Sequence, residues 1–324
     1  MLKLFKSRPH SFIGIDLSLT SIKVLEISSK NNQLSIENYG YERLPVFALT
    51  HNREKAISCI KNILISMEKH NKHVAIALSD AMVVSKTIEL ANCLNEMEIE
   101  KLIFMEPNHY FAQPLNKIYL DYVLRGSSNQ SSEMVEIQLF ASREDNVSWR
   151  LNLLKDSGLE VKLVDVESYV IATVIEKMLP EYKTKVLILL ILSSESIRLF
   201  AYENGKNVYN REDLLEKNQP QALGQEAVAV SSIEKYLIYV KLSLQYFLSS
   251  SHLKFIDQIL VAGEMKELPY LVLKIYEETD WPTAVADPFK KVAISNTINL
   301  DKFKNLAPLF FLALGLVLRQ SDEY

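Results

Sequence analysis

Cysteine, glycine and long apolar runs are all scarce in this sequence. Its 324 residues include two cysteines and eight glycines, too few for a disulfide framework or a collagen-like repeat. Cys59 and Cys93 therefore indicate a reducing compartment. The longest apolar stretch, residues 306–318, contains Pro308 and Gly315 and falls short of the roughly 18 apolar residues that a membrane span needs. We expect a soluble, cytoplasmic protein.

An excess of one charge sign is also missing. The 36 basic and 40 acidic residues give a formal net charge of −4, which provides no electrostatic case for a nucleic-acid partner. The six histidines are scattered without the cysteine or acidic neighbours of a metal site, so we expect no bound metal. Hydrophobic residues make up 48% of the chain and charged residues 23%, and the length suffices for two lobes with a full core.

The stretch FIGIDLSLTSIKVLEI, residues 12–27, contains two runs of strand-forming residues around a short polar turn. Residues 12–16 and 22–27 are rich in isoleucine and valine, which pack well on a pleated surface. The pattern predicts a β-hairpin.

The tip of this hairpin carries Asp16, Ser18, Thr20, Ser21 and Lys23. In nucleotide-binding hairpins such a tip offers backbone N–H groups and hydroxyls to phosphate, while the aspartate holds a metal-bound water. The alternative is a capped surface turn, because serine, threonine and aspartate are common in turns of every kind.

The rest of the chain alternates between helical and strand patterns. We expect strands at 33–41, 73–78, 83–90, 119–124, 134–141, 159–166 and 255–262, and helices at 53–70, from about 95, at 143–157, 167–179, 228–250, 267–277 and 301–319. Asn95 and Glu98 are spaced as a capping pair, and Gly158 stands at a helix C-terminus. Three antiparallel strands, a helix and a strand open the chain in the manner of a ribonuclease-H-like lobe.

A second hairpin repeats the first. Residues 196–199 (SIRL) align with residues 21–24 (SIKV), and an Asn204-Gly205 turn follows, the strongest short hairpin signal. A duplicated lobe that opens with a hairpin is the organisation of the actin, Hsp70 and hexokinase superfamily, in which a nucleotide lies between the hairpins.

The alignment also reveals a defect in the second copy. Ile191 stands opposite Asp16, Ser193 opposite Ser18, and Glu195 opposite Thr20. An aliphatic side chain cannot position a metal-bound water, and a carboxylate repels phosphate. We expect half of the phosphate clamp to be lost and turnover with it.

Several stretches resemble, in the same order, motifs of the PilM family, the cytoplasmic actin-like component of type IV pilus assembly. They are FIGIDLSLTSIKVLEI (12–27), KLIFMEPNHYFAQPLNKIYLDY (101–122), WRLNLLKDSGLEVKLVDVES (149–168), DPFKKV (287–292) and LALGLVLR (312–319). The resemblance implies an α/β, actin-like, two-lobed fold. The chain then divides into a first lobe at 1–79 and 161–182 (subdomain 1A), an inserted β-α-β-β-α subdomain 1C at 80–160, a second lobe at 183–300 and a closing helix at 301–324.

The resemblance also implies a partner, the N-terminal cytoplasmic peptide of the inner-membrane protein PilN. PilM proteins bind this peptide as an extended segment between subdomains 1A and 1C, and such docking uses main-chain hydrogen bonds and side-chain pockets. The candidate groove residues are Val83, Val84, Ser85, Tyr110, Phe111, Pro114, Leu115, Tyr119 and Asp121. The protein would then lie at the inner-membrane face through its partners. Binding to other pilus platform and motor proteins, and formation of a homo-oligomer, remain open.

The PilM family also binds ATP, and here the sequence departs from it. Asp16, Ser18, Thr20, Ser21, Lys23 and Gly263 match as vestigial phosphate-site residues. The second hairpin lacks its acidic residue, and Gly263 is followed by Glu264, where relatives have consecutive glycines that admit the nucleotide. The resemblance therefore favours a non-catalytic scaffold without a required cofactor. The alternative is an ATP-binding switch or slow ATPase anchored by Asp16, and a cell-division homologue of the FtsA type is a weaker third reading.

Overall fold

The chain folds into two units, Met1–Ala77 with Ser157–Tyr324, and Leu78–Asp156. The computed structural model describes residues 10–30, 33–44, 52–67, 72–105, 111, 117–128, 131, 133–215, 232–263 and 267–320. Among these residues, no helix is both long and apolar enough to cross a lipid bilayer.

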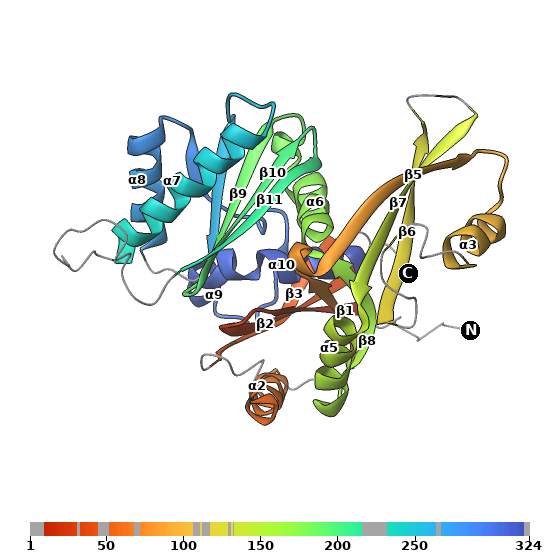
Figure 1. Cartoon of the computed structure of the whole chain (residues 1–324). Coiled ribbons are helices and arrows are strands. Elements are labelled where there is room, and N and C mark those ends of the chain that lie inside the picture. The colour runs from red at the N-terminus through yellow and green to blue at the C-terminus, as the bar shows by residue number, and fades with distance from the viewer. Residues whose placement is uncertain are drawn as a thin grey trace, which may run out of the picture. The chain divides into compact units, whose positions relative to one another are not determined.

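The larger unit opens with a six-stranded sheet in the order β14-β3-β2-β1-β4-β8. Its strands are β1 (His10–Leu17), β2 (Ser21–Lys30), β3 (Gln33–Arg43), β4 (His73–Leu78), β8 (Glu160–Val166) and β14 (Ala293–Ile294). The predicted hairpin is present, because β1 and β2 pair antiparallel from His10↔Ser29 to Leu17↔Ile22. Figure 1 shows α2 (Arg53–Ser66) on one side of β2 and β3, where it buries Ala56, Cys59, Ile60 and Ile63.

A second, five-stranded sheet follows in the order β11-β10-β9-β12-β13. Its strands are β9 (Val186–Leu192), β10 (Ser196–Glu203), β11 (Lys206–Leu214), β12 (Gln258–Gly263) and β13 (Thr283–Val285). The helices α7 (Ser232–Ser250) and α8 (Leu268–Thr279) lie side by side on one face of this sheet (Figure 1), and their apolar side chains share a core with alternate residues of β9 and β12. Asn204 and Gly205 have φ values of 52° and 74°, as the predicted tight turn requires.

The space between the two sheets is filled by α6 (Glu167–Met178), α9 (Leu300–Leu306), the 3₁₀ turn η5 (Ala307–Phe310) and α10 (Phe311–Gln320). Their buried side chains form one cluster with Leu25 and Ile27 of the first sheet and Leu189 and Phe200 of the second. We call the first sheet with α2 and α6 the first lobe, and the second sheet with α7 and α8 the second lobe.

The closing segment corrects one prediction. A single helix at 301–319 was expected, but α9 ends at Leu306 and α10 begins at Phe311. Pro308 explains why α-helical hydrogen bonding is interrupted by the 3₁₀ turn η5, since proline lacks an N–H group. Phe303 of α9 and Phe310 of η5 both pack against Tyr39, with ring centroids 5.1 and 5.6 Å away.

The strand predicted at 255–262 is shorter at its start. β12 begins at Gln258, and Phe255 is 60% exposed. Asp257 accounts for the later start, because its N–H donates to the Val186 carbonyl and its carboxylate accepts from the Val186 N–H. The helices predicted at 53–70 and 228–250 are present as α2 and α7, and residues 68–70 and 228–231 lie outside the described part of the chain.

The smaller unit is a three-stranded sheet, in the order β5-β7-β6, with two helices. Its elements are β5 (Val83–Ala91), α3 (Glu96–Met105), β6 (Ile118–Ser127), β7 (Met134–Arg143) and α5 (Glu144–Asp156), which is the expected β-α-β-β-α order. Asn95 and Glu98 cap α3 reciprocally, with N···O distances of 2.9 and 3.1 Å. Ile99 and Ile103 of α3 then pack on the central strand β7.

A substitution at Gly14 can test how closely β1 approaches α10. A Cβ atom at this position would lie 2.1 Å from the Ala313 carbonyl oxygen, a backbone atom that cannot move without shifting the helix. We expect Gly14→Ala to lower the free energy of unfolding by about 3 kcal/mol, measured by urea denaturation. Gly205→Asn is the control, because asparagine tolerates positive φ and the nearest atom there is 3.5 Å away. Equal stability of Gly14→Ala and the wild type would contradict this close contact.

Candidate functional site

The tip of the first hairpin is closed by its own hydrogen bonds. The Ser18 N–H donates to the Ser21 carbonyl at 3.0 Å, and the Ser18 hydroxyl donates to the same carbonyl at 3.0 Å. The Ser18 and Ser21 hydroxyl oxygens are 2.9 Å apart. Two of the three candidate hydroxyls therefore contact each other within the turn. The third, on Thr20, is buried.

Asp16 and Lys23 form an ion pair inside this hairpin. They face each other across the β1–β2 ladder, and Lys23 Nζ lies 3.1 Å from Asp16 Oδ2. Both side chains are only 6% exposed, and Lys23 Nζ also reaches the Ser18 hydroxyl at 3.4 Å. The candidate metal anchor is thus already neutralised by an ammonium group from the neighbouring strand.

The second hairpin reproduces the first in its backbone. The Ser193 N–H donates to the Ser196 carbonyl at 2.9 Å, and the Ser193 hydroxyl contacts both Ser196 oxygens at 3.2 Å. A long-range bond is repeated as well. Leu44 N–H donates to the Thr20 carbonyl and Leu215 N–H to the Glu195 carbonyl, each at 2.7 Å. The internal duplication expected from the sequence is confirmed.

The side chains of the second hairpin differ as the alignment predicts. Ile191 faces Arg198 across the β9–β10 ladder, in the register that Asp16 and Lys23 occupy in the first copy. Ile191 is 9% exposed and belongs to the core between the sheets. Strand β9 therefore supplies no carboxylate opposite Arg198, whose register neighbour on the other side is Glu212 of β11.

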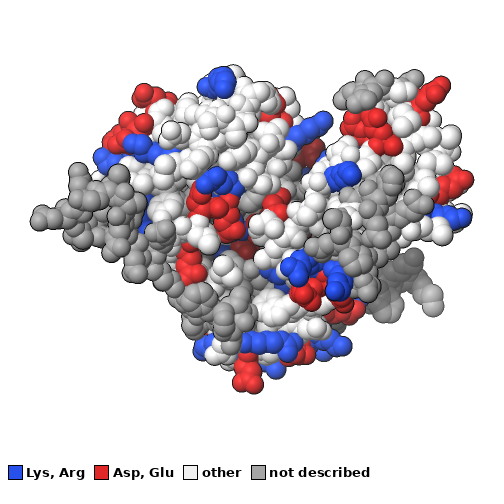
Figure 2. All heavy atoms as spheres, viewed as in Figure 1, with Lys and Arg blue, Asp and Glu red and all other residues white. Residues whose placement is uncertain are grey.

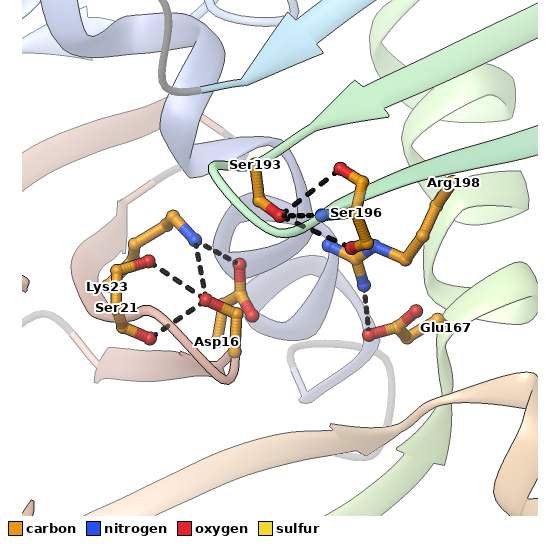
Figure 3. Close-up of polar contacts among 8 residues, drawn as sticks. Asp16, Ser21, Lys23, Glu167, Ser193, Ser196 and Arg198 are labelled. Carbon is orange, nitrogen blue, oxygen red and sulfur yellow. Dashed lines mark hydrogen bonds and ion pairs between the residues drawn. The ribbon is translucent and has the colours of Figure 1, made fainter. Parts of the chain in front are cut away.

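Arg198 finds its carboxylate on a helix instead. Its Nη1 donates to Glu167 Oε1 at 2.5 Å, and both side chains are 10% exposed. Figure 3 shows this pair beside Ser193 and Ser196, with Asp16 and Lys23 on the first hairpin. Burial opposes the charge of Arg198, but the attraction of Glu167 and Asp16 more than offsets burial and raises its pKa above the ordinary value.

Gly263 has a structural reason to be glycine. Its φ is +137°, and a Cβ atom there would lie 2.1 Å from the Leu192 carbonyl oxygen on the neighbouring strand. This close approach between β12 and β9 accounts for the glycine without a nucleotide. Glu264 lies outside the described residues.

These side chains do not fit a magnesium–nucleotide complex held by both hairpins. Magnesium prefers carboxylate and water oxygens. Here one hairpin offers a carboxylate bound to Lys23, and the other offers isoleucine and an arginine. Among the described residues, no cluster of three or more His, Cys, Asp or Glu side chains could hold a metal ion.

Sequence reasoning missed the arginine partners of Glu167 and Asp165. Glu167 is the partner of Arg198, and Asp165 accepts from Arg319 Nε at 2.5 Å and from the Val166 N–H at 2.7 Å. A signal for the first was available, because a buried arginine aligned with Lys23 but facing isoleucine needs a carboxylate from elsewhere. The identity of that carboxylate depends on tertiary packing.

The candidate peptide-binding residues fall mainly on the two outer strands of the smaller sheet. Val83, Val84 and Ser85 lie on β5, and Tyr119 and Asp121 on β6. Phe111 is 8% exposed and packs in the core of this unit. The remaining candidates, Tyr110, Pro114 and Leu115, lie outside the described residues.

Strand register groups four of these residues. Ser142 on β7 is opposite both Val83 and Tyr119, and Phe140 is opposite both Ser85 and Asp121. Directly opposed residues of antiparallel strands share a face, so Val83, Ser85, Tyr119 and Asp121 lie on one face of the sheet. Val84 lies on the other face, opposite Ala141, and is 62% exposed.

The buried pair in the first hairpin can be tested by charge removal. Lys23→Met leaves the Asp16 carboxylate buried without its ammonium partner, so we expect a loss of about 3 kcal/mol in unfolding free energy. Asp16→Asn combined with Lys23→Met should recover most of this loss. Lys274→Met is the control, because the Lys274–Glu277 pair is 35% and 58% exposed and should contribute little to stability. Equal losses in the single and double variants would argue against a coupled pair.

Comparison with known proteins places these features in context. The sequence model of "Type IV pilus assembly protein PilM" matches residues 14–223 and 224–321. The chain is similar to a solved structure titled "PilM-PilN type IV pilus biogenesis complex", with a TM-score of 0.76, 19% identity, and coverage of 96% of this chain and 99% of that one. It is also similar to the ethanolamine utilization protein EutJ from Carboxydothermus hydrogenoformans, with a TM-score of 0.53, 9% identity, and coverage of 96% and 90%. The chain has an actin-like α/β fold and belongs to the type IV pilus assembly protein PilM family.

Proposed function

We propose that this protein is a non-catalytic scaffold of the type IV pilus inner-membrane platform that captures the N-terminal cytoplasmic peptide of PilN. The observation that carries the proposal is the likeness along nearly the whole chain to the structure of a PilM–PilN complex. The chain would then lie at the cytoplasmic face of the inner membrane because its partner is anchored there.

The smaller sheet offers a physical means of peptide capture. Among the described strands, β5 and β6 pair only with β7, so each has one edge without a strand partner. An extended peptide can pair with such an edge through main-chain hydrogen bonds, while side chains on the sheet face select its sequence. Tyr119 suits this selective role, because it is 47% exposed and an aromatic side chain buries a large apolar area on binding.

The described residues on the face drawn in Figure 2 form no large patch of one charge sign that would attract an oppositely charged partner. Acidic and basic side chains are interspersed over that face. Where the surface charge is mixed in this way, selectivity for the peptide would rest on strand pairing and apolar contacts. This is consistent with the low net charge of −4.

The site between the hairpins supports the non-catalytic part of the proposal. Phosphoryl transfer depends on a positioned metal and on positive groups that contact the phosphates. Asp16 is bound to Lys23, and Arg198 is bound to Glu167. Both basic groups are thus engaged by carboxylates of the protein itself.

Peptide capture predicts a specific loss of affinity on the outer strands. A synthetic peptide with the PilN cytoplasmic N-terminus should bind the wild type in calorimetry, and Tyr119→Ala should weaken binding about tenfold through lost apolar contact. The control is Val208→Ala on β11, which is also an outer strand and where Val208 is 41% exposed. A folded wild type that does not bind the peptide would refute the proposal.

The second candidate function, an ATP-binding switch, is favoured by the intact tip of the first hairpin. It predicts tight magnesium–ATP binding that is lost in Asp16→Ala. Our proposal predicts no measurable heat and no thermal shift at millimolar ATP, because Asp16 is paired with Lys23 and Arg198 with Glu167. Binding that requires Asp16 would favour the switch over the scaffold.

A further inference from the structure

The duplicated hairpins use their basic residues in different ways. In the first copy, Lys23 pairs within its own hairpin, with Asp16 on the neighbouring strand. In the second copy, Arg198 pairs with Glu167, which lies 31 residues earlier in the chain at the start of α6. The basic residue of the first hairpin therefore pairs within its own lobe, whereas the basic residue of the second hairpin pairs with a residue of the other lobe.

A second hydrogen bond joins the same two elements. The Tyr202 hydroxyl donates to the Ser168 carbonyl at 2.7 Å, and Tyr202 is fully buried. Arg198 and Tyr202 are four residues apart on β10 and so lie on the same face of the sheet. They meet consecutive residues, Glu167 and Ser168, in the first turn of α6.

The surroundings of this contact favour a full ion pair. Glu167 lies at the N-terminus of α6, where the helix dipole stabilises a carboxylate. Asp16 on the first hairpin adds a further attraction on Arg198. The arginine charge is thus held between an acidic group of the first hairpin and an acidic group of the adjoining helix.

We propose that Arg198 is a built-in tie between the lobes: its guanidinium joins the second hairpin to Glu167 and holds the two lobes together without a nucleotide–metal complex. In a two-sided phosphate clamp, the ligand itself bridges the hairpins. Here a side chain of the second hairpin makes that connection permanently. The inference is independent of peptide capture, because it concerns only the larger unit.

The tie can be tested by measuring the separation of the lobes. Spin labels at Ile65→Cys on α2 and Leu273→Cys on α8 report it, since these side chains are 74% and 59% exposed. Cys93→Ser removes the exposed native thiol, and Cys59 is buried. Pulsed electron resonance should give one narrow distance distribution in the parent protein. Magnesium–ATP at about 5 mM, which is above typical enzyme KM values, should leave this distribution unchanged.

Removal of the tie should loosen the two lobes, which remain joined through the shared apolar core. Arg198→Met should broaden the distance distribution and lower the melting temperature by about 10 °C, because Glu167 stays buried but loses the positive charge of Arg198. The combined variant Arg198→Met with Glu167→Gln removes both charges. It should recover most of the melting temperature but keep the broad distribution. It also preserves the test if the single variant does not fold.

The matched control is Lys183→Met. Lys183 pairs with Glu176, also on α6, but these side chains are 50% and 60% exposed, so both readouts should stay at the parent values. Two results would overturn the inference. One is a narrow distribution in the folded combined variant. The other is a broad distribution in the parent protein that magnesium–ATP narrows, together with loss of this narrowing in Arg198→Met. That result would make Arg198 a phosphate ligand.

Discussion

The close packing of α10 between the two sheets is the constraint on which the rest of the larger unit depends. Gly14 on β1 touches the α10 backbone, and Gly315 on α10 leaves room for Val170 on α6. These contacts fix β1 and α6 against one helix. Because Asp16 lies on β1 and Glu167 begins α6, the same packing also fixes the acidic groups around the hairpins.

Burial then decides how these charges are used. A buried charge is costly unless it is paired, so each basic residue of the duplicated hairpins requires a carboxylate close by. Ile191 stands where the first copy has Asp16; it packs in the core, and Arg198 pairs with Glu167. The outcome is a hairpin with the same backbone as its copy but with a different partner for its charge.

Much of this arrangement could be predicted from the sequence, because local patterns and the repeat carry it. The Asn95–Glu98 cap, the Asn204-Gly205 turn and the left-handed Gly158, at φ +86°, each depend on a few neighbouring residues. The alignment of the hairpins identified position 191, occupied by Ile191, as the place where the acidic anchor is missing.

Other features depend on contacts that no local pattern reports. Pro308 is visible in the sequence, but the apolar run around it does not tell a continuous buried helix from one divided by a 3₁₀ turn. The partner of Arg198 could not be found from spacing, because Glu167 meets it only after the two sheets close around α6 and α10. The late start of β12 was likewise set by Asp257 and Val186, which are far apart in sequence.

The smaller unit leaves and rejoins the larger one at adjacent strands. The chain departs after β4 and returns in β8, its neighbour in the six-stranded sheet, and the Glu160 N–H already donates to the Lys72 carbonyl at 2.7 Å. The host sheet is therefore continuous across the insertion point. A lineage can exchange or reshape the inserted module without rebuilding the sheet that carries it.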